Sequence, residues 1–182
     1  MEKQVIFVVF CLAMAPVYGQ YYSETVMPSP RQERMTRLHF FLHDILSGQN
    51  PSAVIIARPN ITGSAISFGS LFAIDDALTI GPEPTSEIIG NAQGMYVSSS
   101  LDPTMFTAVM YADFAFTSGA FNGSSFSLFS RNPSSPPIRE LAIVGGRGAF
   151  RMASGYALIR NSFLNLTTGD TIVEFNVTLY HY

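Results

Sequence analysis

The side chains best suited to chemistry in this sequence are two histidines and an aspartate in one apolar segment, His39-Phe-Phe-Leu-His-Asp-Ile45. Two histidines four residues apart share one face of a helix and can bind zinc together there. On a β-strand the same spacing separates them by about 13 Å, which is too far for one ion. Because the aromatic residues between them favour a strand, we expect no metal site. His181 is the only other histidine.

Asp44 is notable because a carboxylate at the end of an apolar segment is seldom buried without a partner. On a strand it shares a face with Phe40 and Leu42. If that face lines an enclosed interior, burial raises the pKa of Asp44 unless a cation lies opposite. The best-placed cation is Arg139, in the strand-like segment 138–144. The two charges suit the binding of a planar phenolic ligand, or they form a structural ion pair that stabilises the fold.

Tyr96 is a third candidate for ligand binding. It lies beside small residues in Ala92-Gln-Gly-Met-Tyr-Val97. A phenol hydroxyl at a cavity wall can donate a hydrogen bond to a ligand oxygen. The alternative is a packed tyrosine whose hydroxyl lies in water, and the sequence leaves both open.

The composition is typical of a globular domain that carries little charge. Of the 182 residues 47% are hydrophobic and 13% are charged, which excludes a disordered chain. The net charge of −3 provides no basic surface for nucleic acid. The chain lacks a Gly-x-Ser-x-Gly motif, and its glycine-rich segment 144–150 matches neither phosphate-binding spacing. We therefore expect no cofactor and no nucleic-acid partner.

The N-terminus is typical of a secretory signal peptide. Lys3 precedes an apolar run from Val5 to Val17, and we expect cleavage after Gly19. The alternative is a membrane anchor, but the run is shorter than the roughly 20 residues that span a membrane. Cys11 and Lys3, the only cysteine and lysine, lie in the segment that would be removed, so we expect no thiol or lysine chemistry in the mature protein. We expect no membrane partner. Passage through a secretory pathway is supported by four glycosylation sequons, which begin at Asn60, Asn122, Asn165 and Asn176.

The remaining chain predicts one all-β domain after a flexible arm at residues 20–36. Short runs rich in β-branched and aromatic residues are separated by glycine, proline, asparagine and serine. They lie at 37–45, 52–57, 65–75, 88–98, 104–117, 124–131, 138–144, 153–163 and 171–181. We expect a single antiparallel sheet of about eight strands, closed into a barrel that has no free edges.

Two further expectations follow from the run at 104–117. Residues at its even and odd positions are both largely apolar, so both faces of this strand need to be covered. One face would line the barrel and the other would pack against another subunit, which predicts an oligomer. Small residues such as Ala108 and Ala112 leave room for a ligand inside a barrel of eight strands.

Six segments, in this order, resemble the plant dirigent proteins, and the resemblance covers about residues 37–182. They are His39–Ile45, Asn91–Val97, Phe121–Ser125, Ile138–Gly146, Phe150–Tyr156 and Val173–Val177, followed by the terminal His181-Tyr182. Each segment alone is a weak signal, but the ordered set is specific.

The resemblance implies an eight-stranded antiparallel β-barrel with a central cavity, assembled as a homotrimer, glycosylated and secreted to the apoplast. It also implies binding of phenoxy radicals or quinone methides from phenylpropanoid metabolism. An oxidase or laccase generates the radicals, and the dirigent protein sets the stereochemistry of their coupling or ring closure.

The resemblance also assigns roles to individual residues. The acid of the family's first strand falls on Asp44, its arginine on Arg139 and its cavity tyrosine on Tyr96, so these are the candidate catalytic residues. The candidate substrate contacts are Asp75, which matches a family aspartate, together with Phe40 and Asn132.

Two positions depart from the members that form pinoresinol. Asn132 replaces an aspartate and Ser98 replaces a second tyrosine. The pattern is more similar to the branch that includes pterocarpan synthases, which act on isoflavanols. One alternative function is therefore a dehydratase that closes an isoflavanol through a quinone methide without an oxidase. Another is a non-catalytic scaffold in lignin deposition. A lectin-like site is disfavoured because tryptophan is absent.

Overall fold

The computed structural model describes residues 23–26, 32–60, 67–102 and 104–182. The chain divides into two units, Met1–Pro30 and Arg31–Tyr182. The predicted signal segment 1–19 lies outside the described residues. Residues 23–26, which belong to the predicted arm, carry no regular secondary structure, and residues 34–36 of that arm begin the first strand.

All described strands belong to the second unit. They are Arg34–Asp44 (β1), Ala53–Ala57 (β2), Leu71–Thr79 (β3), Ile88–Ser98 (β4), Thr107–Phe116 (β5), Ser125–Pro133 (β6), Arg139–Arg147 (β7), Ser154–Leu164 (β8) and Thr171–His181 (β9). Two short 3-10 helices, Gly119–Phe121 (η1) and Gly148–Phe150 (η2), lie in the β5–β6 and β7–β8 connections.

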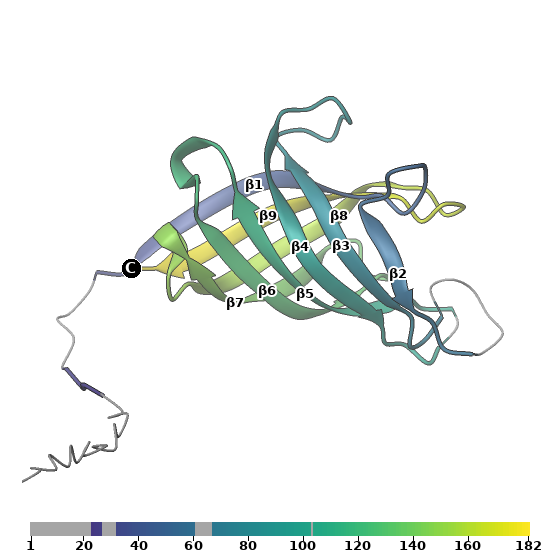
Figure 1. The fold of residues 1–182 in the computed structure, drawn as a ribbon, viewed down its shortest axis with the longest axis horizontal. Helices are drawn as coiled ribbons and strands as arrows, with labels where there is room; N and C mark the ends of the chain where they lie inside the picture. The colour runs from purple at the N-terminus through teal and green to yellow at the C-terminus, as the bar shows by residue number, and fades with distance from the viewer. Residues whose placement is uncertain (1–22, 27–31, 61–66, 103) are drawn as a thin grey trace, which may run out of the picture. The chain divides into compact units, whose positions relative to one another are not determined.

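The strands form an antiparallel sheet that closes on itself. The order is β1-β9-β8-β7-β6-β5-β4-β3-β2, and an additional pairing joins β1 to β3. That pairing, from Phe41 opposite Thr79 to His43 opposite Ala77, closes a barrel of eight strands. The short β2 pairs with the same edge of β3, at residues 71–74, whereas β1 pairs with residues 77–79. The predicted eight-stranded antiparallel barrel is confirmed (Figure 1).

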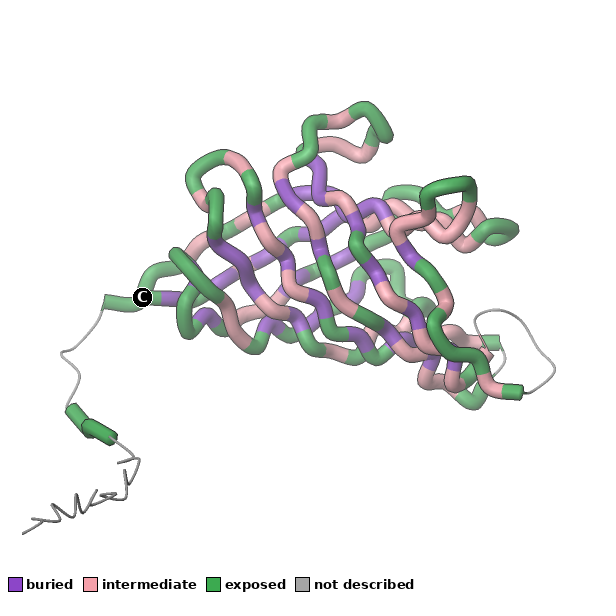
Figure 2. Tube along the Cα trace, viewed as in Figure 1, coloured by how far each residue is buried: buried purple, intermediate pink, exposed green. Residues whose placement is uncertain are grey.

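Alternation along each strand sorts side chains between the interior and the outer surface. Figure 2 shows buried and exposed residues following each other along the strands. In β5, for example, Ala108, Met110, Ala112 and Phe114 are buried, whereas Val109 between them is exposed. This two-residue period is the one from which the sequence predicted the strands.

The interior is not filled evenly along the barrel. Near the end that carries the C-terminus and both 3-10 helices, the side chains of five phenylalanines pack against one another: Phe40, Phe114, Phe116, Phe126 and Phe175. Phe114 and Phe126 stack with ring centroids 4.8 Å apart, and Phe150 contacts Phe116 from η2. Small inward residues such as Gly94 and Ala108 follow toward the opposite end, where the β1–β2 and β8–β9 loops lie (Figure 1). One end is therefore closed by aromatic packing, and the space lies at the other.

Within the described residues, no helix is long and apolar enough to cross a membrane.

We predict that the aromatic end supplies much of the stability of the domain. Phe114→Ala removes a fully buried ring, and we expect the free energy of unfolding, measured by urea denaturation, to fall by about 3–5 kcal/mol. Phe163→Ala is the control because that ring is about half exposed, and we expect a loss of about 1 kcal/mol or less. Equal losses for the two variants would contradict a core centred on these rings.

Candidate functional site

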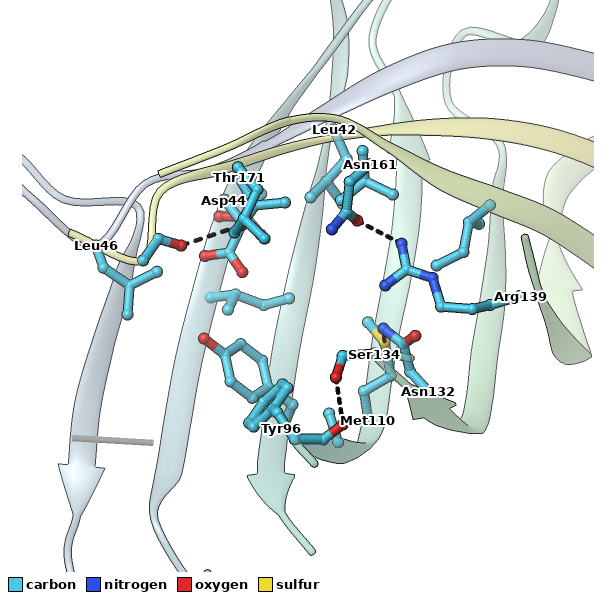
Figure 3. Close-up of a pocket in the computed structure, with 18 of the residues that line it drawn as sticks. Leu42, Asp44, Leu46, Tyr96, Met110, Asn132, Ser134, Arg139, Asn161 and Thr171 are labelled. Atoms are coloured by element: carbon cyan, nitrogen blue, oxygen red, sulfur yellow. Dashed lines mark hydrogen bonds between the residues drawn. The ribbon is translucent and has the colours of Figure 1, made fainter. Parts of the chain in front are cut away.

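The open half of the barrel encloses a cavity of about 280 Å³. Every one of the eight barrel strands contributes to its wall, and the loops at 45–52, 99–106, 134–138 and 165–170 contribute to its rim. The lining is mostly apolar, with a few polar groups that converge on the space (Figure 3). A cavity of this size and character suits a small aromatic molecule.

One wall carries two carboxyl groups. Asp44 ends β1 and Asp76 lies in β3, and both line the cavity. The two strands are neighbours, and the last pair in their register is His43 with Ala77. The next residues along the two strands are Asp44 and Asp76, so barrel closure places these two acids next to each other.

Burial and neighbouring negative charges keep these acids from ionising at their usual pH. Burial, followed by the charge of Asp170, raises the pKa of Asp44 to about 7. Burial, followed by the charge of Asp44, raises the pKa of Asp76 to about 9, although a hydrogen bond with Ser52 opposes the rise. Asp76 is therefore a neutral acid at neutral pH, and Asp44 gains and loses its proton near pH 7.

The opposite wall carries a guanidinium. Arg139, at the start of β7, is buried, and its Nη2 donates a hydrogen bond to Oδ1 of Asn161 at 2.5 Å. Its Nε has no hydrogen-bond partner, and neither has Oδ1 of Asn132 on the adjacent strand β6. Burial lowers the pKa of Arg139 but leaves it charged at neutral pH. Figure 3 shows Arg139 and Asp44 on opposite sides of the space.

Asp44 and Arg139 do not form the structural ion pair that the sequence allowed. The ion pairs within the described residues join His39 to Glu174, Arg147 to Asp113 and Arg160 to Glu174. Oδ1 of Asp44 has no hydrogen-bond partner either. An uncompensated acid and an uncompensated cation therefore face one cavity, and buried polar groups of this kind need a partner to offset the loss of water.

Tyr96 completes the polar part of the wall. Its ring stacks on Phe72 with centroids 4.5 Å apart, which holds the side chain in place. Figure 3 shows its hydroxyl directed toward the side of the cavity that holds Asp44. Burial, followed by the charges of Asp44 and Asp76, raises its pKa well above the usual value. Tyr96 therefore stays protonated and can donate a hydrogen bond to a ligand.

Four of the six predicted catalytic and substrate-contact residues line the cavity: Asp44, Tyr96, Asn132 and Arg139. Phe40 does not, because it is fully buried and stacks on Phe175 in the aromatic end. Asp75 points to the outer surface, where the amides of Asn91 and Gln93 donate to its carboxylate at 2.6 and 2.9 Å.

The next residue, Asp76, has the position in the cavity that the sequence analysis gave to Asp75. Alternation could have identified it, because Asp76 falls on the same face of its strand as the apolar Ile74 and Leu78. Asn161 had no such signal. It precedes a register shift between Asn161 and Phe163 in β8, and a shift of this kind alters which side chains face inward.

The histidines that opened the sequence analysis lie on the outer side of β1. Nε2 of His39 lies 2.8 Å from Glu174, and Nε2 of His43 lies 2.8 Å from Oγ1 of Thr79. No group of three or more histidine, cysteine, aspartate or glutamate side chains that could hold a metal occurs in the part of the chain that the structure describes.

We predict that Asp76 makes the stability of the protein fall as pH rises. Its pKa is about 9 in the fold, against 3.8 for an exposed aspartate. Between these values the unfolded chain loses the proton and the folded protein keeps it, so rising pH favours unfolding. Asp76→Asn cannot ionise and removes this effect. In thermal unfolding, we expect its Tm to exceed that of the native protein by about 3 °C or more at pH 8.

At pH 3 both states of the native protein hold most of this proton, so Asp76→Asn and the native protein should melt within about 1 °C of each other. A variant that is less stable than the native protein at pH 8 would show that Asp76 is ionised in the fold.

Comparison with known proteins agrees with this geometry. The profile of the family "Dirigent-like protein" matches residues 35–180. Dirigent protein 15 of Arabidopsis thaliana is 52% identical over 185 residues, which cover 98% of this chain and 97% of that protein. Pterocarpan synthase 1 of Glycine max is 45% identical over 188 residues, and the match covers 100% of both chains.

A solved structure has the same barrel. The pterocarpan synthase dirigent protein PsPTS1 superimposes with a TM-score of 0.79 at 45% identity, covering 84% of this chain and 99% of that one. The family profile, the relatives and the closed barrel all lead to one conclusion: this chain is a member of the dirigent protein family.

Proposed function

We propose that the protein binds a phenolic quinone-methide or phenoxy-radical intermediate of phenylpropanoid or isoflavonoid metabolism and imposes stereoselectivity on its cyclisation or coupling. The observation that carries this proposal is the pair of unpaired poles in one apolar cavity. Asp44 and Asp76 form one pole, and Arg139 with Asn132 forms the other. A phenolic molecule with oxygens at both ends satisfies both poles, while the apolar walls hold its rings.

The carboxyl pole favours a dehydration that closes a ring. Protonated Asp44 gives its proton to a benzylic hydroxyl, the C–O bond breaks and water leaves. A phenol conjugated with that carbon gives its proton to solvent at the cavity entrance, which leaves a neutral quinone methide, and Arg139 stabilises the negative charge that develops on that oxygen. A second phenol oxygen of the same molecule attacks the carbon and passes its proton to Asp44, while the quinone-methide oxygen takes a proton back. The net change is the loss of one water.

The walls determine which face of the quinone methide is attacked. The substrate is held between rigid strands, so one approach of the attacking oxygen is favoured over its mirror image. Tyr96 donates a hydrogen bond to an oxygen near Asp44 and limits rotation of the substrate. This reaction needs no oxidant, as expected for a protein similar to the pterocarpan synthases.

A second candidate function is the direction of radical coupling. An oxidase or laccase would supply phenoxy radicals, and the cavity would hold each radical in one orientation while the bond forms. The match of residues 35–180 to the dirigent family profile supports this candidate, because the resemblance to that family implies direction of radical coupling. It requires the shape of the cavity but no proton transfer from Asp44 before the coupling step.

One assay distinguishes these functions. The purified protein is given a panel of isoflavanols without oxidant and a panel of monolignols with laccase, and the products are separated by chiral chromatography. Loss of water without oxidant supports the dehydratase. An enantiomeric excess that appears only with laccase supports the directing role. Racemic products in both arms would contradict both functions and favour a non-catalytic scaffold of the plant cell wall.

We predict separate losses for the two poles in whichever reaction is observed. Asp44→Asn removes the proton donor, so we expect dehydration to slow by about 100-fold or more. Because the pKa of Asp44 is about 7, native kcat/KM should fall as pH rises through that value. Arg139→Leu removes a charged hydrogen-bond donor and should lower kcat/KM by about 10-fold or more.

Arg160→Leu is the matched control, because Arg160 is exposed and pairs with Glu174 on the outer surface. Unchanged turnover and enantiomeric excess in both Asp44→Asn and Arg139→Leu would exclude these residues from the mechanism.

We also propose that the mature protein is secreted to the apoplast and glycosylated. The sequons support this, because Asn60, Asn122 and Asn176 are all exposed. Asn165 is partly buried at the rim of the cavity, and its Oδ1 accepts hydrogen bonds from the backbone of Thr167 and Thr168. A glycan there would lie beside the cavity entrance.

We further propose that the protein forms a homotrimer through the outer face of β3–β6. The register aligns Ala73, Met95, Tyr111 and Phe129 in one row across these strands. Met95, Tyr111 and Phe129 are exposed in the single chain. Asn176 lies on β9, four strands away from β5 in the closed ring of eight, so a glycan there would leave the row uncovered.

We predict that Tyr111→Glu combined with Phe129→Glu abolishes this assembly, because two buried charges oppose association. In sedimentation velocity, the native deglycosylated protein should behave as a trimer at micromolar concentration and the double variant as a monomer. Leu158→Glu, a charge placed on exposed outer β8, should remain a trimer. A native protein that sediments as a monomer would contradict the proposal.

A further inference from the structure

Ser52 lies behind the carboxyl pole and does not line the cavity. It precedes β2, and its backbone is held on both sides. Its N–H donates to the carbonyl of Ile45 at 2.8 Å, and its carbonyl accepts from the N–H of Asp75 at 2.8 Å. The segment before β2 is thereby tied to the end of β1 and to β3. The position of the Ser52 hydroxyl relative to Asp76 is consequently set by the sheet.

The Ser52 hydroxyl has three neighbours. The backbone N–H of Ile45 donates to its Oγ at 3.0 Å. The carbonyl of His43 lies 3.1 Å from Oγ, and Oδ1 of Asp76 lies 2.6 Å from it. A hydroxyl has one proton and two lone pairs, so it can donate to only one of these two oxygens at full strength.

Both oxygens that face the hydroxyl take part in a hydrogen bond at full strength when Asp76 carries a proton on Oδ1. Asp76 then donates to Ser52, Ser52 donates to the carbonyl of His43, and Ile45 donates to the second lone pair of Ser52. An ionised Asp76 would instead compete with His43 for the single proton.

The surroundings of Asp76 agree with a neutral acid. The ionisable groups around it are Asp44 on β1, Asp75 beside it on β3, Tyr96 on β4 and, beyond Asp44, Asp170. Arg139 lies in the opposite wall. None of the ion pairs within the described residues includes Asp76. Its second oxygen, Oδ2, is buried at the cavity wall and has no hydrogen-bond partner.

We propose that Ser52 is a positioning residue that turns the proton of neutral Asp76 away from the cavity, so that Oδ2 of Asp76 is a fixed acceptor for a ligand hydroxyl. Asp44 is then the one acid of the pair that exchanges a proton with the ligand. The part of this inference that concerns the ligand rests on the proposed function, whereas the position of the proton does not. The two acids thus have different roles although they lie side by side.

The position of the proton is tested by infrared spectroscopy on the full protein, without ligand. At pH 8 Asp44 is mostly ionised, and we expect one protonated-carboxyl C=O band that Asp76→Asn removes. Ser52→Ala deletes the acceptor of the proton, so the band should change in frequency. Ser52→Thr keeps the hydroxyl and should keep the band. The matched control is Ser127→Ala, which removes another serine–aspartate hydrogen bond, to Asp113 on the outer surface, and should leave the band unchanged.

Two results would overturn the proposal. One is the absence of any protonated-carboxyl band at pH 8 in the native protein. The other is a band whose frequency and titration are the same in Ser52→Ala as in the native protein. Thermal unfolding of each variant shows whether it is folded. If Ser52→Ala does not fold, Ser52→Thr is compared with the native protein instead. A shifted band in Ser52→Thr would also contradict the proposal.

The acceptor is tested by ligand binding, with 4-propylphenol and its methyl ether 4-propylanisole as probes. Only the phenol can donate to Oδ2 of Asp76, so the native protein should bind it more tightly than the ether. We expect Ser52→Ala to reduce this preference about tenfold, since the proton is then free to move to Oδ2. An unchanged preference would remove the role of Ser52 in ligand binding. The infrared measurement tests the position of the Asp76 proton even if neither phenolic reaction is found. The proposal about Ser52 and the proposed function can therefore be contradicted independently of each other.

Discussion

Pairing between β1 and β3 is the interaction on which the other features of the structure depend. Only the segment from Phe41 to His43 takes part on β1, opposite Ala77 to Thr79. This short pairing turns an open sheet into a closed barrel, and closure excludes water from the interior. The same pairing brings Asp44 beside Asp76, so the contact that completes the fold also creates the carboxyl pole of the cavity.

Closure leaves the barrel with an interior that its own side chains fill at only one end. Large rings close the end near η1 and η2, while smaller residues leave space at the other. Several polar groups that line this cavity have buried atoms without a hydrogen-bond partner. Burial without an ion-pair partner is the largest cause of the raised pKa values of Asp44 and Asp76, and Arg139 likewise is buried without an ion-pair partner. A ligand with polar ends supplies what the protein lacks.

Much of this organisation could be predicted from residue patterns. Period-two alternation identified the strands and put Asp44 on the same face as Phe40 and Leu42, because side-chain direction along a strand is a local property. Phe40 has the same parity as Asp44, yet it lies deep in the aromatic packing. Parity reports the face of a strand but not the depth along the barrel. Asp75 and Asp76 are adjacent and point to opposite faces of β3, and which of the two faces the cavity depends on the register of the sheet.

The sequence by itself determined the all-β class, the alternation and the scarcity of charge, because these depend on residue types and on contacts between near neighbours. Only the tertiary structure decided that Asp44 meets Asp76, that Ser52 forms a hydrogen bond with Asp76, and that Asp44 lies across the cavity from Arg139 without pairing with it. Those relations join residues far apart in the chain through the tilt and stagger of the barrel strands. Hydrogen-bond register sets the stagger, and a shift of one residue would send each of these side chains to the opposite face.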